Sequence, residues 1–251
     1  METTETKDHV EVKPNQLENS ELSDIVHQLS HDIGNPLTSI ITYGSLIEQC
    51  GDLNIPPEKI SNYAKSMLSE TWKISTMVEK FLLLVSEKTN NSSCNLKSVA
   101  TKIMSRYQSR YGLTSFDLEL TGFDQDYLVQ ADPEQLTCIL CELLTNAANA
   151  LKDLSTNNDE IDLSLNLIAD FKSENQVSIS ISNLTTKHEI PLNELLNPGV
   201  SETHVGKTSI GIGLSAVNNT ITKWGGNFII SEIKDNDNYV FSAIITLPTV
   251  S

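Results

Sequence analysis

Cysteine is scarce in this sequence of 251 residues. The four cysteines are Cys50, Cys94, Cys138 and Cys141. So few, at such irregular spacing, exclude the disulfide framework of a small secreted protein. The last two form a Cys-x-x-Cys pair inside an apolar, helix-periodic stretch. This setting favours a buried pair over redox or zinc chemistry, which stays open as the alternative.

Basic residues are also few. The chain has 17 lysines and arginines against 33 aspartates and glutamates, which gives a formal net charge of −16. The resulting field repels phosphate backbones and anionic lipids. We therefore expect neither nucleic acid nor a membrane surface as a partner.

Long hydrophobic runs are absent. The longest unbroken apolar run is FLLLV at residues 81–85, whereas a helix that crosses a bilayer needs about 20 apolar residues. The beginning, METTETKDHVEVK, is polar and lacks the apolar core of a signal peptide. These features predict a cytoplasmic protein without a membrane span, in which residues 1–19 form a disordered tail.

Two stretches carry apolar residues at alternating spacings of three and four. The first has Val26, Leu29, Ile33, Leu37, Ile40, Gly44 and Ile47, and the second has Ile60, Ala64, Met67, Thr71, Ile74, Val78, Phe81 and Val85. With the turn around Pro56 and Pro57 between them, they predict an antiparallel helical hairpin over residues 20–90. One hairpin cannot bury both seams, so we predict a homodimeric four-helix bundle.

A polar linker at residues 88–95, KTNNSSCN, precedes a different pattern. Apolar and polar residues alternate over 161–167 and 177–181, and two further apolar stretches flank residues 235–238, which predicts strands of a mixed or antiparallel sheet. One helix is expected to begin after Asp132 as N-cap, and another to cover residues 215–224. Residues 95–251 should form an α/β sandwich, which makes the whole chain α+β.

The segment SHDIGNPLTSI places His31 on the first predicted helix, followed directly by Asp32. A histidine that accepts a phosphoryl group needs one free ring nitrogen, and a carboxylate that binds the other N–H fixes that tautomer. Asn35 follows one helical turn later, where its amide could position a water molecule for the reverse hydrolysis. Pro36 removes a helix hydrogen bond beside the site.

Two simpler interpretations compete with this one. A lone His-Asp pair on a long helix is usually only solvated surface. His27, four residues before His31, also creates a His-x-x-x-His pattern, but no third zinc ligand stands at a suitable spacing.

Several segments resemble the two-component histidine kinases. HDIGNPLTSI is similar to their phosphoacceptor motif, CELLTNAANAL to their asparagine box, and GVSETHVGKTSIGIGL with WGGNF to their ATP lid and second glycine box. The resemblance covers about residues 20–248 in the family's order. It implies a dimeric hairpin followed by an ATP-binding sandwich of the Bergerat type.

The resemblance also implies the site and the activity. His31, Asp32 and Asn35 would be catalytic, with ATP and Mg²⁺ as cofactors and a response-regulator receiver domain as partner. The residues that it assigns to the nucleotide site are Glu142, Asn146, Asn149, Asn183, Lys207, Gly211, Gly213 and Leu214. Among these, Glu142 and Asn146 would lie on the metal side, because carboxylate and amide oxygens suit Mg²⁺.

The sequence departs from the family at the adenine-binding box. Asn183 stands where aspartate is usual, and Thr185 and Lys187 replace glycines. A neutral amide accepts a weaker hydrogen bond than a carboxylate does. A histidine phosphotransferase that receives its phosphoryl group from another protein is therefore the alternative function. A regulatory ATPase or serine kinase of the same superfamily would have no use for the hairpin.

Overall fold

The computed structural model describes residues 19–50, 56–85, 92–111, 117–121, 126–155, 164–173, 175–200, 211–235 and 238–250. The described residues fall into two compact units, with the division between Leu82 and Leu83.

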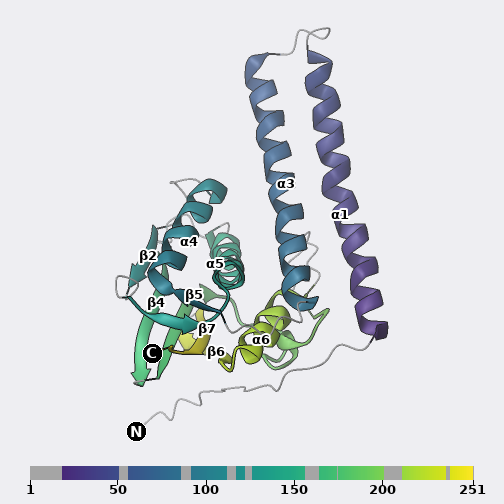
Figure 1. The fold of residues 1–251 in the computed structure, drawn as a ribbon. Coiled ribbons are helices and arrows are strands. Elements are labelled where there is room, and N and C mark those ends of the chain that lie inside the picture. The colour runs from purple at the N-terminus through teal and green to yellow at the C-terminus, as the bar shows by residue number, and fades with distance from the viewer. Residues whose placement is uncertain are drawn as a thin grey trace. The chain divides into compact units, whose positions relative to one another are not determined.

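The first unit is the predicted helical hairpin, made of α1 (Asn19–Glu48) and α3 (Pro57–Val85) (Figure 1). The last three residues of α3 belong with the second unit. Inside the hairpin, the rings of Tyr43 and Tyr63 stack with centroids 5.9 Å apart. A Cβ atom at Gly44 would contact the Met67 Cε atom at 3.7 Å. Antiparallel pairing of the two helices is therefore confirmed.

The fully buried positions of α1 coincide with the predicted seam only in part. Ile25, Leu29, Asp32 and Pro36 lie at spacings of four, three and four and are buried. Val26 and Leu37, which we expected in the same seam, are 42% and 45% exposed. Leu29 of the predicted seam is buried, and Ile33, Ile40, Gly44 and Ile47 are half-buried. Exposure of Val26 and Leu37 in a single chain agrees with the expectation that one hairpin cannot bury the whole seam.

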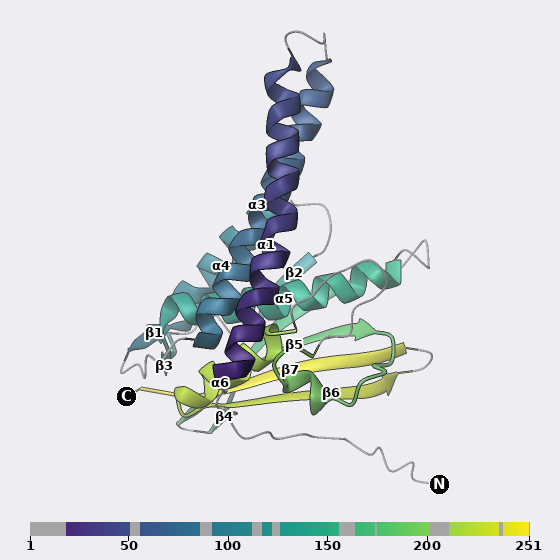
Figure 2. The same ribbon diagram turned by 90° about the vertical axis from the view of Figure 1, so that its right-hand side faces the viewer.

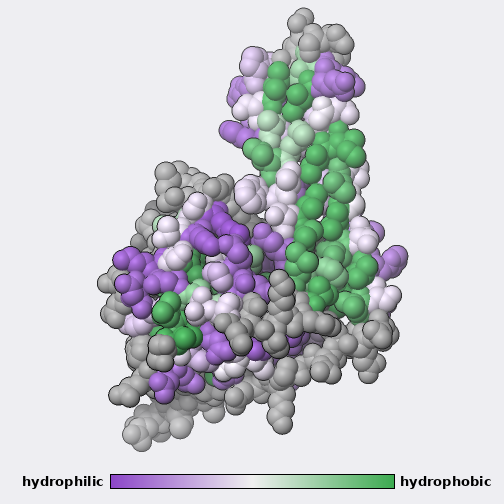
Figure 3. Space-filling model, in the orientation of Figure 1, coloured by the Kyte–Doolittle hydropathy of each residue, from purple (hydrophilic) through white to green (hydrophobic). Residues whose placement is uncertain are grey.

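Large apolar side chains remain exposed along the hairpin. They are Val26, Leu37 and Ile41 of α1, and Leu68, Trp72, Val78 and Leu82 of α3. In Figure 3, hydrophobic surface follows the length of these helices. A patch of this extent on an isolated chain usually marks an interface.

The second unit contains a two-stranded and a five-stranded sheet among its described residues. Strands β1 (Ser93–Asn95) and β3 (Leu128–Gln130) pair antiparallel. The larger sheet has the order β2-β4-β5-β7-β6. Its strands are β2 (Asp117–Thr121), β4 (Ser164–Ser173), β5 (Gln176–Thr185), β6 (Asn227–Asp235) and β7 (Asn238–Pro248). The β2–β4 pair is parallel and the others are antiparallel, so the predicted mixed sheet is confirmed.

One face of the larger sheet forms the core of this unit. Buried residues of β5, β7 and β6 share rows across the register, such as Ile179, Ile245 and Phe228. Helices α4 (Leu96–Tyr111), α5 (Pro133–Ser155) and α6 (Gly213–Lys223) complete the unit, with α5 packed on β5 and α6 on β6 (Figure 2). A short 3₁₀ helix, η1 (Glu194–Leu196), contacts α6.

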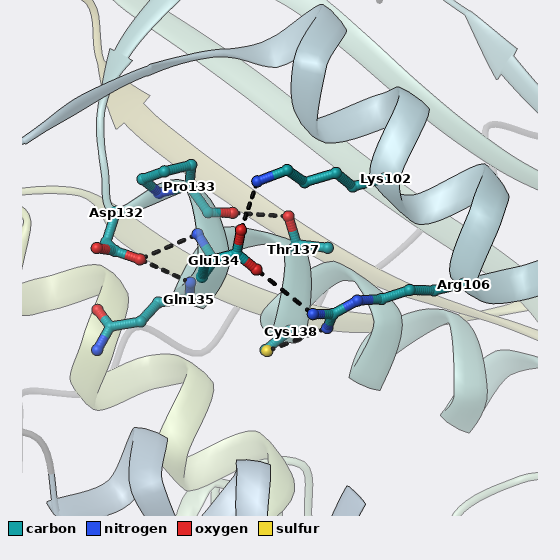
Figure 4. A network of polar contacts seen from close by, with 8 residues as sticks. All are labelled: Lys102, Arg106, Asp132, Pro133, Glu134, Gln135, Thr137 and Cys138. Atoms are coloured by element: carbon teal, nitrogen blue, oxygen red, sulfur yellow. Dashed lines mark hydrogen bonds and ion pairs between the residues drawn. The ribbon is translucent and has the colours of Figure 1, made fainter. Parts of the chain in front are cut away.

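Helix α5 begins as the sequence predicts. The Asp132 Oδ1 atom accepts hydrogen bonds from the backbone N–H groups of Glu134 (3.0 Å) and Gln135 (2.9 Å). From α4, Lys102 and Arg106 both pair with the Glu134 carboxylate (Figure 4). These contacts hold the first turn of α5, the helix with the predicted asparagine box, against α4.

Candidate functional site

His31 presents its imidazole ring to solvent from α1, with 74% of the side chain exposed. Its Nδ1 atom lies 3.1 Å from Asp32 Oδ1. An ionised carboxylate can only accept a hydrogen bond, so Nδ1 carries the proton. In the neutral ring, Nε2 then holds a lone pair. His31 and Asp32 together thus give an exposed imidazole ring with one fixed tautomer, which is what phosphoryl transfer to a histidine requires.

Asp32 is buried, in contrast to His31, with 6% of its side chain exposed. Its second oxygen, Oδ2, is buried and makes no hydrogen bond to any part of the chain that the structure describes. Pro36 lies four residues later inside α1 and has no N–H to donate to the Asp32 carbonyl. The helix nevertheless continues through this position.

The other two polar residues near this pair lie on the surface of α1. Asn35 is exposed one turn after His31, as a residue that positions water would need to be. His27 is also exposed. Among the described residues, no group of three His, Cys, Asp or Glu side chains is placed to hold a metal ion.

The second set of predicted residues lies on α5. Glu142 is buried, with 5% exposure, Asn146 is half-buried one turn later, and Asn149 is exposed. Residues four apart share one side of a helix, so the Glu142 carboxylate and the Asn146 amide face the same way. Both offer hard oxygen ligands. With no larger set of acidic or histidine ligands described, Mg²⁺ here would also need oxygens from a bound phosphate.

Helix α6 begins against Glu142. Gly213 is its first residue, and a Cβ atom there would clash with Glu142 Oε1, so a larger residue would require the Glu142 carboxylate to move. The N-cap residue, Ile212, makes no side-chain capping bond. Leu214 is half-buried in the first turn. The structure thus brings Glu142, Gly213 and Leu214 together, although they lie about 70 residues apart in the sequence.

Gly211 is held in a left-handed conformation just before α6. Its φ of +68° is left-handed, and a Cβ atom would lie 2.6 Å from the Val200 carbonyl oxygen. Its own carbonyl accepts a hydrogen bond from the Gly199 N–H (3.1 Å). Glycine is therefore required at Gly211 by the chain's own packing. Lys207 lies outside the described residues.

Asn183 lies on the buried face near the end of β5, with 6% exposure. Its Nδ2 atom donates to the Leu184 carbonyl at 2.9 Å, which leaves Oδ1 as an acceptor. Across the sheet, Asn183 pairs with Phe241, and Phe241 with Glu232. His188 contacts that row, with Nδ1 2.6 Å from Glu232 Oε1 and the ring 5.2 Å from Phe241.

We did not predict the His188–Glu232 pair. It holds the segment that follows Asn183 against β6. This segment includes Thr185 and Lys187, which replace glycines of the adenine-binding box. A signal was present: Glu232 continues the inward alternation of Phe228 and Ile230 on β6. A carboxylate on that face needs a partner.

The cysteines support no separate site. Cys138 and Cys141 are half-buried instead of fully buried, and Arg106 Nη1 donates to Cys138 Sγ at 3.4 Å. Their Cβ atoms, three residues apart on a regular helix, are about 5–6 Å apart, too far for an unstrained disulfide. Burial, aided by the Asp132 carboxylate, raises the pKa of the Cys94 thiol to about 11, so this thiol stays protonated at neutral pH.

Comparison with known proteins now adds to this geometry. Residues 21–90 match the His Kinase A (phospho-acceptor) domain. The sensor protein VanS of Enterococcus faecium is 27% identical over 228 residues, which covers 86% of this chain. The chain spans 55% of the length of VanS. In the part of the chain that the structure describes, no helix is both long and apolar enough to cross a membrane.

Solved structures share the fold at low identity. The histidine kinase AdeS of Acinetobacter baumannii is 17% identical, with a TM-score of 0.55, over 88% of this chain and 98% of AdeS. A bacterial phosphotransferase is 14% identical, with a TM-score of 0.52, over 92% of this chain and 100% of that protein. Likeness at this level concerns the fold alone.

Proposed function

We propose that this chain acts as a two-component sensor histidine kinase, which moves the γ-phosphoryl group of ATP to His31, and from there to a receiver-domain aspartate of a response regulator. The observation that carries the proposal is the exposed His31 ring whose Nδ1 proton is held by Asp32. We further propose that the chain acts in the cytoplasm, where ATP is available.

In the proposed step, the Nε2 lone pair of His31 attacks the γ-phosphorus atom. A P–N bond forms while the P–O bond to the β-phosphate breaks, and ADP leaves with the bonding electrons. Nδ1 keeps its proton throughout. The adjacent Asp32 carboxylate, 3.1 Å away, stabilises the positive charge that develops on the ring.

The second unit would bind the nucleotide. Glu142 and Asn146 are the metal-side residues, and Mg²⁺ would neutralise phosphate charge there when bound. The backbone of Gly213 and Leu214 at the start of α6 would meet phosphate oxygens. Asn183 Oδ1 would accept a hydrogen bond from the adenine amino group, and Lys207 would neutralise the γ-phosphate. Asn149, which is exposed, would lie at the edge of the site.

Asn35 supports the reverse direction. An exposed amide one turn from the phosphorylated ring can orient a water molecule for hydrolysis of a phosphorylated receiver. We therefore include phosphatase activity in the proposal.

The test is incubation of the full chain with γ-labelled ATP and Mg²⁺. We expect label that is stable in alkali and lost in acid, because a phosphoramidate hydrolyses in acid. A phosphorylated receiver domain serves as the second donor. Label from the receiver but not from ATP would replace the kinase proposal with the phosphotransferase alternative, and label from neither would refute both.

Nucleotide binding should depend on Asn146. We expect Asn146→Ala to weaken Mg²⁺-ATP binding at least about tenfold, because an oxygen ligand to the metal is lost. Isothermal titration calorimetry measures the change. Asn193→Ala is the matched control, since Asn193 caps η1 without a side-chain hydrogen bond. Equal affinity in the parent and Asn146→Ala would remove Asn146 from the site.

We also propose that the chain is a homodimer through its hairpin. The apolar side chains exposed on α1 and α3 would be covered by the same residues of a second copy. A two-fold arrangement of two hairpins makes the four-helix bundle that buries them.

A charge in this surface should split the dimer. Leu68 is 62% exposed, so Leu68→Glu should leave the hairpin folded and yet place an unpaired carboxylate in the interface. We expect a monomer at micromolar concentration by light scattering. Asn62→Glu, an exposed polar position of α3, is the control and should stay dimeric. A parent chain that is already monomeric would contradict the homodimer.

A further inference from the structure

The segment that follows β5 is bound to a strand that is not the neighbour of β5. Strand β5 ends at Thr185 and pairs with β7, whereas His188 reaches Glu232 on β6, the strand beyond β7. The Glu232 Oε1 atom accepts two hydrogen bonds from His188, from the backbone N–H at 3.2 Å and from Nδ1 at 2.6 Å. An ionised carboxylate can only accept, so Nδ1 carries the proton. The two bonds fix both the backbone and the ring of His188.

This pair lies on the same face of the sheet as Asn183. Residues directly opposite each other in neighbouring antiparallel strands share one face, and the register joins Asn183, Phe241 and Glu232 in a single row. The His188 ring lies against the middle of this row, with its centroid 5.2 Å from that of Phe241. Residues 186–188 therefore cross the sheet close to the side chain that the proposed function assigns to adenine.

His188 is the buried anchor of these three residues. The side chains of His188 and Glu232 are 19% and 12% exposed, so water has little access to the bonds between them. Hydrogen bonds to an ionised group are also roughly twice as strong as those between neutral groups. Thr186 and Lys187, by contrast, are exposed. The path of residues 186–188 over the sheet therefore depends on the contact of His188 with Glu232.

We infer that the His188–Glu232 pair positions the nucleotide base, because it holds residues 186–188 in place as one wall of the base site beside Asn183. Glycines let a chain turn closely around a ligand, but two glycines of this box are replaced by larger residues. Here a tertiary contact sets the path of the chain instead. When the pair opens, the base loses this wall, while the phosphates at the start of α6 keep their contacts. The inference rests on the proposed function for the identity of the ligand.

Two other roles for the pair predict different behaviour. A contact that only stabilises the sheet would affect thermal unfolding and leave the binding of ATP to the folded protein unchanged. A contact that shapes the whole site would matter equally for the base and for the phosphates. Only the positioning role predicts a loss of affinity that is confined to a ligand with a base.

The experiment compares ATP with inorganic tripolyphosphate, which has no base, by isothermal titration calorimetry of the full chain in Mg²⁺. His188→Ala removes the ring, and Glu232→Gln keeps an acceptor oxygen but removes the charge. His188→Asn is the conservative variant, because its amide can donate a hydrogen bond from close to the position of Nδ1. Thr186→Ala, at an exposed position of the same segment, is the matched control.

We expect His188→Ala to bind ATP about tenfold more weakly, because apparent affinity falls with the fraction of molecules in which the segment is in place. Its affinity for tripolyphosphate should match that of the parent. Glu232→Gln should show the same pattern with a smaller loss, His188→Asn should recover most of the affinity, and Thr186→Ala should match the parent. The double variant His188→Ala/Glu232→Gln should bind ATP as His188→Ala does, since the two residues act as a unit.

Limited digestion with trypsin reports the position of the segment without any ligand. Lys187 is exposed and precedes His188, so the bond between them becomes more accessible to trypsin when the pair opens. We expect cleavage after Lys187, followed by mass spectrometry, to be at least about threefold faster in Glu232→Gln, which leaves the sequence around the bond unchanged. Glu194→Gln, at an exposed position, controls for the change in net charge.

Thermal unfolding shows whether each variant is folded, and Glu232→Gln carries the test if His188→Ala is not. Unchanged ATP affinity in the folded variants overturns the inference, and so does an equal loss for ATP and tripolyphosphate. Cleavage after Lys187 at the parent's rate in Glu232→Gln also overturns it.

Failure of this inference is distinct from failure of the proposed function. If the parent takes label from ATP and the variants bind ATP as the parent does, the inference falls alone. If the parent binds ATP without labelling His31, and the loss in His188→Ala is confined to ATP, the kinase proposal falls and the positioning role stands. A parent that does not bind ATP contradicts both.

Discussion

Replacement of His31 by glutamine is expected to abolish the acid-labile label from γ-labelled ATP completely. Glutamine has a similar length and polarity but no nucleophilic ring nitrogen, so no P–N bond can form. His31 is 74% exposed and its hydrogen-bond partner is its neighbour Asp32, so the hairpin should keep its fold. Labelling followed by acid and alkali treatment measures the result.

The matched control is His27→Gln. His27 lies four residues earlier on the same helix and is also exposed, but its sequence neighbours, Val26 and Gln28, carry no carboxylate. We expect this variant to keep the label of the parent. Retention of acid-labile label in His31→Gln, or its loss in His27→Gln, would mean that the phosphoacceptor has been assigned to the wrong histidine.

Asp32→Asn should slow labelling by about 10²-fold or more, the scale of a lost acid–base contribution. An asparagine amide can donate a hydrogen bond to Nδ1, which moves the imidazole proton to Nε2 and removes the attacking lone pair. A carboxylate cannot do this. The substitution also removes the charge that stabilises the phosphorylated ring. The rate of label incorporation at saturating ATP gives the size of the effect.

A structural role for Asp32 must be separated from this chemical one. Nitrogen NMR shifts of the His31 ring report the tautomer directly, so we expect a change from Nδ1–H to Nε2–H in Asp32→Asn. Unchanged ATP binding would place the defect after nucleotide binding, as the proposal requires. A normal labelling rate with a changed tautomer would show that the His31–Asp32 hydrogen bond is not needed for transfer.

Most of the fold could be predicted because its strongest signals are local. Asp132 and Pro133 mark the start of α5 through capping and a fixed φ angle, and the structure shows the capping bonds. Apolar and polar residues alternate around Val177 and Ile179 because one face of β5 packs into the core, and this alternation predicts the strand. By contrast, β1 and β3 have three residues each and depend on a pairing between Cys94 and Val129. Strands of this length are too short to show the alternation of apolar and polar residues that predicts a strand.

In the candidate site too, contacts between sequence neighbours could be predicted, and contacts between distant segments could not. His31 and Asp32 are neighbours in the sequence, so their hydrogen bond could be expected from the sequence alone. The contact of Glu142 with Gly213, and that of His188 with Glu232, join segments 71 and 44 residues apart. Such contacts follow from how the helices and strands pack.

The hydrogen bond between Gly199 and Gly211 brings two ends of the chain together before α6 begins. This contact fixes the distance between the two glycines, so the start of α6 does not depend on the number of residues that join them. Because the free energy of closing a loop grows only with the logarithm of its length, a doubling costs roughly 0.6 kcal/mol. In evolutionary terms, we expect a change in the number of residues between Gly199 and Gly211 to be tolerated, because the contact that precedes α6 would be kept.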